Sequence, residues 1–297
     1  MTQYSKTSGI IGLLTASFFW GAEFVVEKDV LSAMGANYSN AIRFFAASIL
    51  CTLFMRKKLK TITRSDLRCG TISGSFMGFG FAFQTMGLGY IDAGVNALLC
   101  SSYILIIPLA EWLLFRKHPG YRIFLYAFIA VMGIGFISYD ASAQAWNFSA
   151  GEGLTFLGAL FYTGAIISIE RFSSKTDPQV MSLLQFYVIT VISMVFALIL
   201  EPIPRMFSSL ILIEFIYLIL FATIGAQLLM NHCIQFVSSA AAGLIFSSEA
   251  LFAAMLGILI LREPSTPTLW LGVILIVGAI ALYQSGFPKK KSHSAKK

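Results

Sequence analysis

The sequence predicts an all-α integral membrane protein with ten transmembrane helices, arranged as two inverted five-helix repeats around a central cavity. Hydrophobic residues make up 57% of the 297 residues and charged residues only 12%, whereas a soluble domain carries about 25% charged residues. Ten apolar stretches each approach the roughly twenty residues that span a bilayer. The first five stretches faintly resemble the second five. Because five is odd, the second copy enters the membrane from the opposite side.

The apolar stretches follow one another with short connections, so no soluble domain is expected beside the bundle. The uncharged segment 215–248 is too long for one span and is divided near Ser238 and Ser239. Residues 1–145 form the first predicted repeat, 146–288 the second, and 289–297 a basic cytosolic tail. The predicted spans cover residues 8–28, 37–55, 69–90, 93–115, 121–139, 153–170, 180–200, 212–234, 239–261 and 267–286.

The distribution of positive charge predicts a multi-pass protein of the inner or plasma membrane with both termini in the cytosol. Cytosolic connections carry an excess of Lys and Arg. In this orientation 17 of the 21 Lys and Arg residues face the cytosol, while Lys28, Arg205 and Arg262 lie outside and Arg43 lies within a span. The net charge of +7 then reflects membrane orientation, and no nucleic-acid partner is expected. The tail anchors this topology or contacts anionic membrane lipid.

A weak internal repeat supports the duplication. The first span matches the sixth at a shift of 143 residues, and the fourth matches the ninth at a shift of 146. In the second alignment Tyr103 is placed opposite Glu249. The matched pairs are Gly21 and Gly164, Glu27 and Glu170, Leu98 and Leu244, Ser101 and Ser247, Ser102 and Ser248, and Arg116 and Arg262. Their consistent order along the chain indicates a repeated five-span unit.

Three segments carry a resemblance to a known family: FWGAEFVV at 19–26, RFFAA at 43–47 and the closing stretch 238–264. They resemble signatures of the EamA-type branch of the drug/metabolite transporter superfamily. The chain departs from the family pattern at Ala250, where many relatives have proline, and at Glu23, where a small or amide residue is common. The resemblance implies ten helices in two inverted repeats and alternating-access transport of a small metabolite. The superfamily serves amino acids, amines, nucleotide sugars and other solutes.

Glycines recur every fourth residue in the third predicted span, at Gly70, Gly74 and Gly78. Such a stripe lets a neighbouring helix approach closely, which is how helices associate in lipid without a hydrophobic driving force. We therefore interpret these glycines as packing positions. The chain has no glycine-rich phosphate loop ending in Lys-Ser or Lys-Thr, so ATP-driven transport by this chain alone is not expected.

Glu249 is the principal candidate for substrate binding. It lies ten residues into the ninth predicted span, about 15 Å deep at 1.5 Å per residue, close to the bilayer midplane. An acid at that depth is costly and must be neutralised by a proton, a cationic substrate or a moving partner. Phe246 shares its helix face and Tyr103 opposes it in the repeat alignment, so both are expected to contact substrate. A structural ion pair is the alternative.

Glu23, Trp20 and Arg43 are further candidates, nearer the outer end. Glu23 shares a helix face with Trp20 and Glu27, so an acid beside an indole could hold a cationic group, or simply form a partly solvated wall. Arg43 lies six residues inside the second span. It could pair with Glu23 or Glu27 or hold a substrate carboxylate, and the pair is favoured. Glu27 is expected to form a solvated pair with Lys28.

Amides form a stripe in the eighth predicted span, where Gln227, Asn231 and Gln235 recur every fourth residue. They spread over only about 80° of the helix and should not face lipid. Either they hydrogen-bond neighbouring helices or they line a polar path, and we retain Gln227 and Asn231 as candidate substrate-binding residues.

The sequence thus predicts a secondary transporter, not an enzyme, that exports a small organic metabolite such as an amino acid or amine. Its three histidines are scattered and its four cysteines form no Cys-x-x-Cys pair, so no catalytic cluster, metal site or cofactor is expected. Proton coupling through Glu249 and downhill transport fit equally. Uptake of a nucleotide-linked or phosphorylated solute is an alternative, against which the excess of acids over Arg43 argues. A membrane sensor or enzyme is a more distant alternative.

Overall fold

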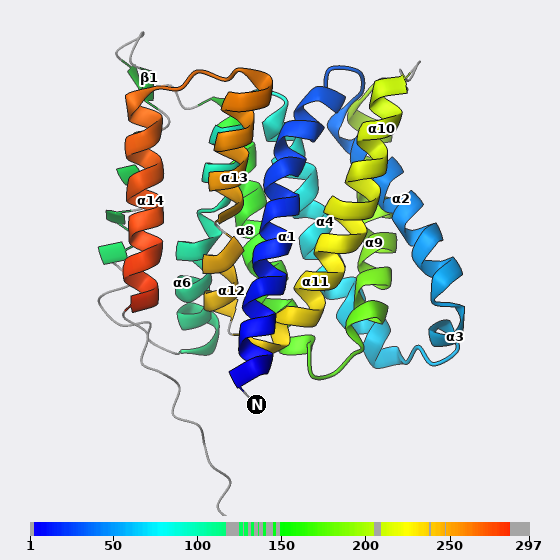
Figure 1. Ribbon diagram of the computed structural model, residues 1–297. Helices are drawn as coiled ribbons and strands as arrows, with labels where there is room; N and C mark the ends of the chain where they lie inside the picture. The colour runs from blue at the N-terminus through cyan, green and yellow to red at the C-terminus, as the bar shows by residue number, and fades with distance from the viewer. Residues whose placement is uncertain are drawn as a thin grey trace, which may run out of the picture.

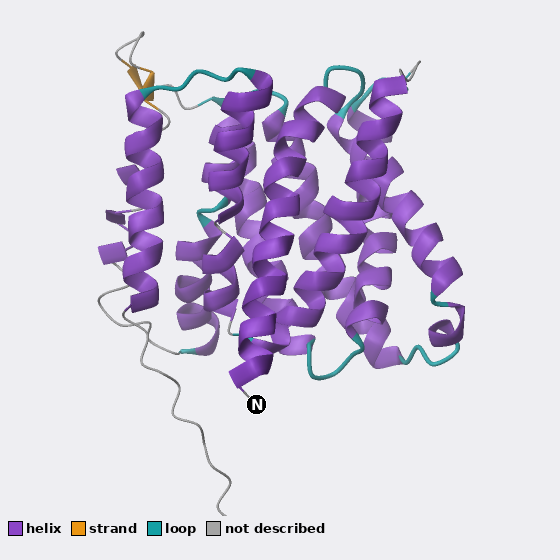
Figure 2. Ribbon diagram, viewed as in Figure 1, coloured by secondary structure: helices purple, strands orange, loops and turns teal. Residues whose placement is uncertain are grey.

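The computed structural model describes residues 3–116, 125–126, 128–129, 132–133, 136, 139–140, 145–146, 149–204, 209–237, 239–246 and 248–285. Long helices lie side by side in a bundle, and a two-residue β pair joins Tyr139–Asp140 to Ala145–Trp146 (Figures 1 and 2). Five helical segments of the described chain are long and apolar enough to cross a membrane: Thr7–Val30, Ala93–Phe115, Ala150–Phe172, Pro178–Leu200 and Ser209–Phe236. Shorter apolar helices cover Ser248–Leu261 and Pro267–Ala279.

Most predicted spans coincide with helices to within a few residues. The first half contains α1 (Gln3–Val30), α2 (Ala36–Phe54), α3 (Arg56–Leu59), α4 (Arg64–Leu88), α5 (Ala93–Cys100) and α6 (Tyr103–Phe115). The second half contains α8 (Ala150–Phe172), α9 (Pro178–Leu200), α10 (Ser209–Tyr217), the π-helix η1 (Leu218–Gly225), α11 (Ala226–Cys233), the 3₁₀ helix η2 (Ile234–Phe236), α12 (Ser239–Phe246), α13 (Ser248–Leu256), the π-helix η3 (Gly257–Leu261) and α14 (Pro267–Ser285). The predicted fifth span, 121–139, lies mostly outside the described residues, and the tail 289–297 lies wholly outside them.

The predicted fourth span differs from expectation, because it consists of two helices with a turn at Ser101 and Ser102. The Ser102 amide donates to the Leu99 carbonyl at 3.1 Å, so the hydrogen-bond spacing shortens from four residues to three. Both sides of the turn are apolar, which is why hydropathy alone gives one continuous span. The turn lies between Cys100 and Tyr103, two residues that matter for the site described below.

Several helices begin where their own sequence caps them. Thr63 and Asp66 form a capping box at the start of α4, and Ser149 and Glu152 form one at the start of α8. Asp177 accepts from two backbone amides at the start of α9, where Pro178 occupies the first turn. In each case the capping side chain lies within three residues of the backbone amide that it caps.

α2 and α5 are capped instead by glutamates from distant connections. The Glu201 carboxylate accepts from the backbone amides of Asn37 at 2.8 Å and Tyr38 at 3.0 Å. The Glu263 carboxylate accepts from those of Ala93 at 2.6 Å and Gly94 at 3.2 Å. A carboxylate is favoured there because helix N-termini present unpaired N–H groups and a positive partial charge. Each cap ties one half of the chain to the other.

Removing the Glu263 cap is expected to destabilise the fold. Glu263→Ala leaves the amides of α5 unpaired and should lower the free energy of unfolding by about 1–2 kcal/mol. Asp92→Ala is the matched control, because Asp92 stands at the N-cap of the same helix but its side chain makes no capping hydrogen bond. Thermal unfolding in detergent measures both variants. Equal losses for the two would contradict the assignment of the cap to Glu263.

The glycine stripe of α4 packs against a neighbouring helix, as predicted. A Cβ atom at Gly70 would meet Leu184 of α9, one at Gly74 would lie 3.0 Å from the Gln185 Cα, and one at Gly78 would meet Ile192. α9 therefore fits into the space that these missing side chains leave. Farther along α4, Gly80 and Gly87 allow the same close approach to α8.

Gly74→Leu is expected to separate α4 from α9. The added side chain must displace Gln185 and Val188, an overpacking that costs about 1–3 kcal/mol. Thermal stability and transport activity should fall together. Thr71→Leu is the control, since Thr71 is exposed on the same helix. An unchanged melting temperature with altered substrate preference would assign the stripe to the site and not to the scaffold.

Candidate functional site

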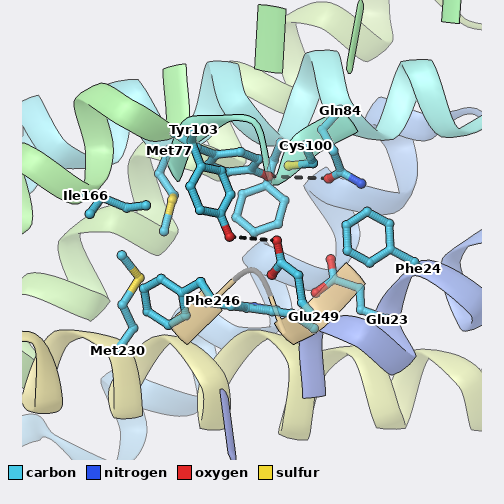
Figure 3. Close-up of a pocket in the computed structure, with 13 residues that line it drawn as sticks. Glu23, Phe24, Met77, Gln84, Cys100, Tyr103, Ile166, Met230, Phe246 and Glu249 are labelled. Atoms are coloured by element: carbon cyan, nitrogen blue, oxygen red, sulfur yellow. Dashed lines mark hydrogen bonds between the residues drawn. The ribbon is translucent and has the colours of Figure 1, made fainter. Parts of the chain in front are cut away.

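A cavity lies between helices of both halves of the chain. Its wall is formed by α1, α4, α5 and α6 from the first half and α8, α11, α12 and α13 from the second (Figure 3). Its volume is about 50 Å³, room for roughly three to five water molecules. The lining residues are Trp20, Glu23, Phe24, Met77, Phe81, Gln84, Cys100, Tyr103, Tyr162, Ile166, Met230, Phe246 and Glu249. Polar groups thus converge in a small, mostly apolar space.

Glu249 lies in the first turn of α13 and points into the cavity (Figure 3). The residue is 5% exposed, and the Tyr103 hydroxyl donates to its Oε1 at 2.9 Å. Its carboxylate forms no ion pair with another described residue. Tyr103 and Glu249, which the repeat alignment placed opposite each other, therefore meet across the cavity. The hydrogen bond from Tyr103 engages one of the two carboxylate oxygens.

Aromatic rings form much of the cavity wall. The rings of Trp20 and Phe246 lie 5.2 Å apart between centroids at 62°, an edge-to-face arrangement. The Trp20 Nε1 donates to the Ala222 carbonyl of η1 at 3.0 Å, which fixes the orientation of the indole. Phe24, Phe81, Tyr103 and Tyr162 complete the aromatic lining. Such π-faces attract cations, and rings held in place do so without an ordering cost.

Glu23 lines the cavity and also holds Arg43. The Arg43 Nη1 lies 2.5 Å from Glu23 Oε1 and 3.6 Å from Glu27 Oε2. Arg43 is fully buried, with its guanidinium 5.0 Å from the ring centres of Phe44 and Phe81. The favoured pair of Arg43 with Glu23 or Glu27 is therefore present. Arg43 is not among the residues that line the cavity.

The expected solvated pair between Glu27 and Lys28 is wrong. Glu27 is 2% exposed and faces Arg43. The Lys28 Nζ donates instead to the carbonyls of Leu88 at 2.7 Å and Ile91 at 2.6 Å. Adjacent residues on a helix point about 100° apart, so neighbours in sequence do not face each other.

Gln227 and Asn231 lie outside the cavity lining. The Gln227 Nε2 donates to Gln185 Oε1 at 2.9 Å. The Asn231 Nδ2 donates to the same oxygen at 2.7 Å and to Ser182 Oγ at 2.8 Å. Their amides thus join α11 to α9, one of the two roles that the sequence left open.

Several lining residues were not predicted. The Gln84 Nε2 donates to Asn96 Oδ1 at 3.0 Å. The Gln84 Oε1 accepts from the Tyr162 hydroxyl at 3.3 Å, which Figure 3 marks as a dashed line. A single glutamine within an apolar span was a usable signal for Gln84. Cys100 is the last residue of α5, and the unexpected turn at Ser101 and Ser102 separates it from Tyr103. Tyr162 had no distinguishing signal, because tyrosines are common in spans.

The described residues contain no group of three or more His, Cys, Asp or Glu side chains that could hold a metal ion. All four cysteines are free and buried. The polar groups of the cavity comprise carboxylates, hydroxyls, an amide and a thiol around an aromatic wall. That arrangement suits reversible binding of a small molecule.

Apolar helices long enough to cross a membrane, with an acid-bearing cavity between the two halves of the chain, are features of a membrane transporter. A model of the EamA-like transporter family matches residues 7–139 and again residues 149–284. The chain belongs to the EamA-like transporter family.

The relatives agree with this assignment. An uncharacterized transporter of Archaeoglobus fulgidus is 28% identical over 272 residues, which are 92% of this chain and 84% of the relative. An uncharacterized transporter of Methanothermobacter thermautotrophicus is 23% identical in an alignment 305 positions long, which covers 94% of this chain and 87% of the relative. A solved structure titled "Crystal structure of protein" has a TM-score of 0.70 at 16% identity and covers 94% of this chain and 97% of its own. That likeness shows the shared fold.

Proposed function

We propose that the chain is a secondary transporter that exports a small organic metabolite with a cationic amino group, an amine or an amino acid, by alternating access. The observation that carries the proposal is Glu249, a buried carboxylate with no ionic partner among the described residues. An unpaired buried charge is costly, so a site of this kind favours a cationic ligand. Trp20, Phe246 and Tyr103 add aromatic faces to the same space.

The charges around the cavity favour an amine over an anionic solute. Glu23, Glu27 and Glu249 provide three buried carboxylates, while Arg43 is the buried guanidinium beside them. Arg43 is already held by Glu23 and is not part of the cavity wall. A phosphorylated or nucleotide-linked solute would therefore meet carboxylates without a free cation. The small volume also suits a compact ligand better than a nucleotide.

The proposed mechanism places the ligand between two inverted repeats of five helices each, ten in all. The two stretches matched by one family model, 7–139 and 149–284, support the two-repeat arrangement. The cavity wall draws on both stretches, and the contact between Tyr103 and Glu249 joins them. Rocking of one repeat against the other would expose such a midplane site to each side in turn.

The proposed topology has both termini and the 56–68 connection in the cytosol. The N-terminus and α3 lie at one end of the bundle, and the α13–α14 connection lies at the other (Figure 1). Cysteines introduced at Thr61 and Ser292 should resist a membrane-impermeant maleimide in intact cells, and one at Tyr90 should react. The native cysteines are buried, which keeps the background low. Extracellular labelling at Ser292 would overturn the topology.

A substrate screen tests the proposed function. Purified protein in proteoliposomes is loaded with small amines, amino acids or phosphorylated solutes, and efflux is followed with and without a pH gradient. We expect amines to be transported and phosphorylated solutes to be rejected. Transport of phosphorylated solutes with no transport of amines would support the alternative carrier. Family membership and the names of both relatives support a transport role in place of catalysis.

A further inference from the structure

We propose that Glu27 is a proton-binding site, linked to the cavity through Arg43 and Glu23, so that binding of a substrate cation releases a proton. The inference rests on the proposed cationic substrate. It places the coupled proton on Glu27, whereas the sequence pointed only to Glu249.

The first observation is that the Glu27 carboxylate is buried and accepts no hydrogen bond from the described residues. Its residue is 2% exposed, and neither carboxylate oxygen has a hydrogen-bond partner among the described residues. The Ser39 hydroxyl lies beside that carboxylate, is fully buried, and also lacks a partner. The Ser39 hydroxyl can donate to an ionised Glu27 and accept from a protonated one, so it can partner Glu27 in both protonation states.

The second observation is the charge of the triad Glu23, Arg43 and Glu27. Two carboxylates share one guanidinium, so full ionisation leaves a net negative charge in a buried site, and this is unfavourable. The distances show which acid holds the ion pair, because Arg43 lies 2.5 Å from Glu23 and 3.6 Å from Glu27. Glu27 is therefore the acid that carries the proton.

A hard metal ion does not fit this place as an alternative to the proton. Such an ion takes about six oxygen ligands, far more than the Ser39 hydroxyl and the Glu27 carboxylate supply.

The charged groups around Glu27 do not supply another counter-ion. On its own helix, Glu23 and Asp29 are acids, and Lys28 is occupied by the Leu88 and Ile91 carbonyls. The packed helices present Arg43 from α2, Glu214 from α10 and, farther off, Glu249 from α13. The remaining titratable groups near the triad are the neutral Cys100, Tyr103, Tyr162 and Tyr217.

Glu23 links this site to the cavity. Its Oε1 holds Arg43, while its Oε2 is buried without a hydrogen bond in a residue that lines the cavity. A substrate ammonium group between Glu23 and Glu249 competes with Arg43 for Glu23. The Nε and Nη2 atoms of Arg43 have no hydrogen-bond partner among the described residues. These N–H groups can therefore donate to Glu27 when Arg43 moves away from Glu23.

The exchange balances charge. One substrate cation enters, Arg43 turns to Glu27, and the Glu27 O–H bond breaks to leave a carboxylate paired with the guanidinium. The proton leaves towards Asp29 and Glu214, acids that lie near one another and near Glu27. The buried charge is the same before and after, so the step exchanges one cation for one proton.

Calorimetric titration with benzylamine in buffers of different ionisation enthalpy tests the link. The wild type should release about one proton per bound ligand. Glu27→Gln should bind benzylamine and release none, whereas the control Asp92→Asn should release protons as the wild type does. Proton release by Glu27→Gln equal to that of the wild type, or binding linked to sodium instead of pH, would overturn the proposal.

Infrared spectroscopy provides a test that needs no ligand. At neutral pH the wild type should show the C=O stretch of a protonated carboxylic acid that Glu27→Gln lacks. If the spectra of the wild type and Glu27→Gln do not differ at that band, the assignment of the proton to Glu27 is overturned. If benzylamine fails to bind the wild type while this band is present, the cationic substrate is wrong and the Glu27 proton site stands.

Discussion

Glu249→Gln should abolish high-affinity binding of an amine substrate while leaving the fold intact. Glutamine keeps the size of the side chain and still accepts the hydrogen bond from Tyr103, but it removes the charge. Removing one partner of a buried charge pair costs about 2–5 kcal/mol of binding free energy, at least a ~30-fold loss of affinity. Binding and counterflow in proteoliposomes measure the effect at several pH values.

The pH profile of the Glu249→Gln variant separates two roles. If Glu249 binds the cationic group, as we propose, affinity falls at every pH. If Glu249 instead carries the coupled proton, the variant still exchanges substrate but no longer responds to a pH gradient. If Glu249→Gln keeps the affinity, the rate and the pH dependence of the wild type, Glu249 is a structural residue and not part of the binding site.

Arg43→Met should produce the largest loss of stability. Methionine occupies similar space between Phe44 and Phe81, but it leaves the Glu23 carboxylate buried beside Glu27 without a cation. Breaking a buried pair in this way costs about 3–5 kcal/mol of unfolding free energy. Thermal or denaturant unfolding in detergent measures the loss.

A combined variant tests the physical reason for that loss. Arg43→Met together with Glu23→Gln and Glu27→Gln removes all three ionisable groups of the triad and should recover most of the stability. If the combined variant is as unstable as Arg43→Met alone, the cost comes from packing around Arg43 and not from the unpaired Glu23 carboxylate.

The positions of the spans were predictable because backbone groups in lipid must bond within a helix, so long apolar runs become helices. The divided segment around Ser238 and Ser239 illustrates this, since η2 ends at Phe236 and α12 begins at Ser239. The turn at Ser101 and Ser102 was not predictable, because it changes hydrogen-bond spacing without changing hydropathy. The distant caps Glu201 and Glu263 depend on tertiary contacts that no local pattern encodes.

The candidate site was predictable where two signals coincided. Glu249 is an acid deep in a span, and the repeat alignment independently paired it with Tyr103. Glu27 was misread because the sequence shows Lys28 beside it, whereas its guanidinium partner comes from another helix. Gln227 and Asn231 formed a clear stripe, but a stripe does not show whether the facing element is a cavity or α9.

A comparison of charged with uncharged ligands shows whether the Glu249 carboxylate receives a cationic group. A panel of small amines, each paired with the uncharged alcohol of the same shape, is titrated against the wild type and Glu249→Gln. We expect the wild type to bind at least one amine about tenfold or more tightly than its alcohol, and Glu249→Gln to lose this preference. Equal binding of amines and alcohols by the wild type, or an unchanged preference in Glu249→Gln, would contradict this expectation.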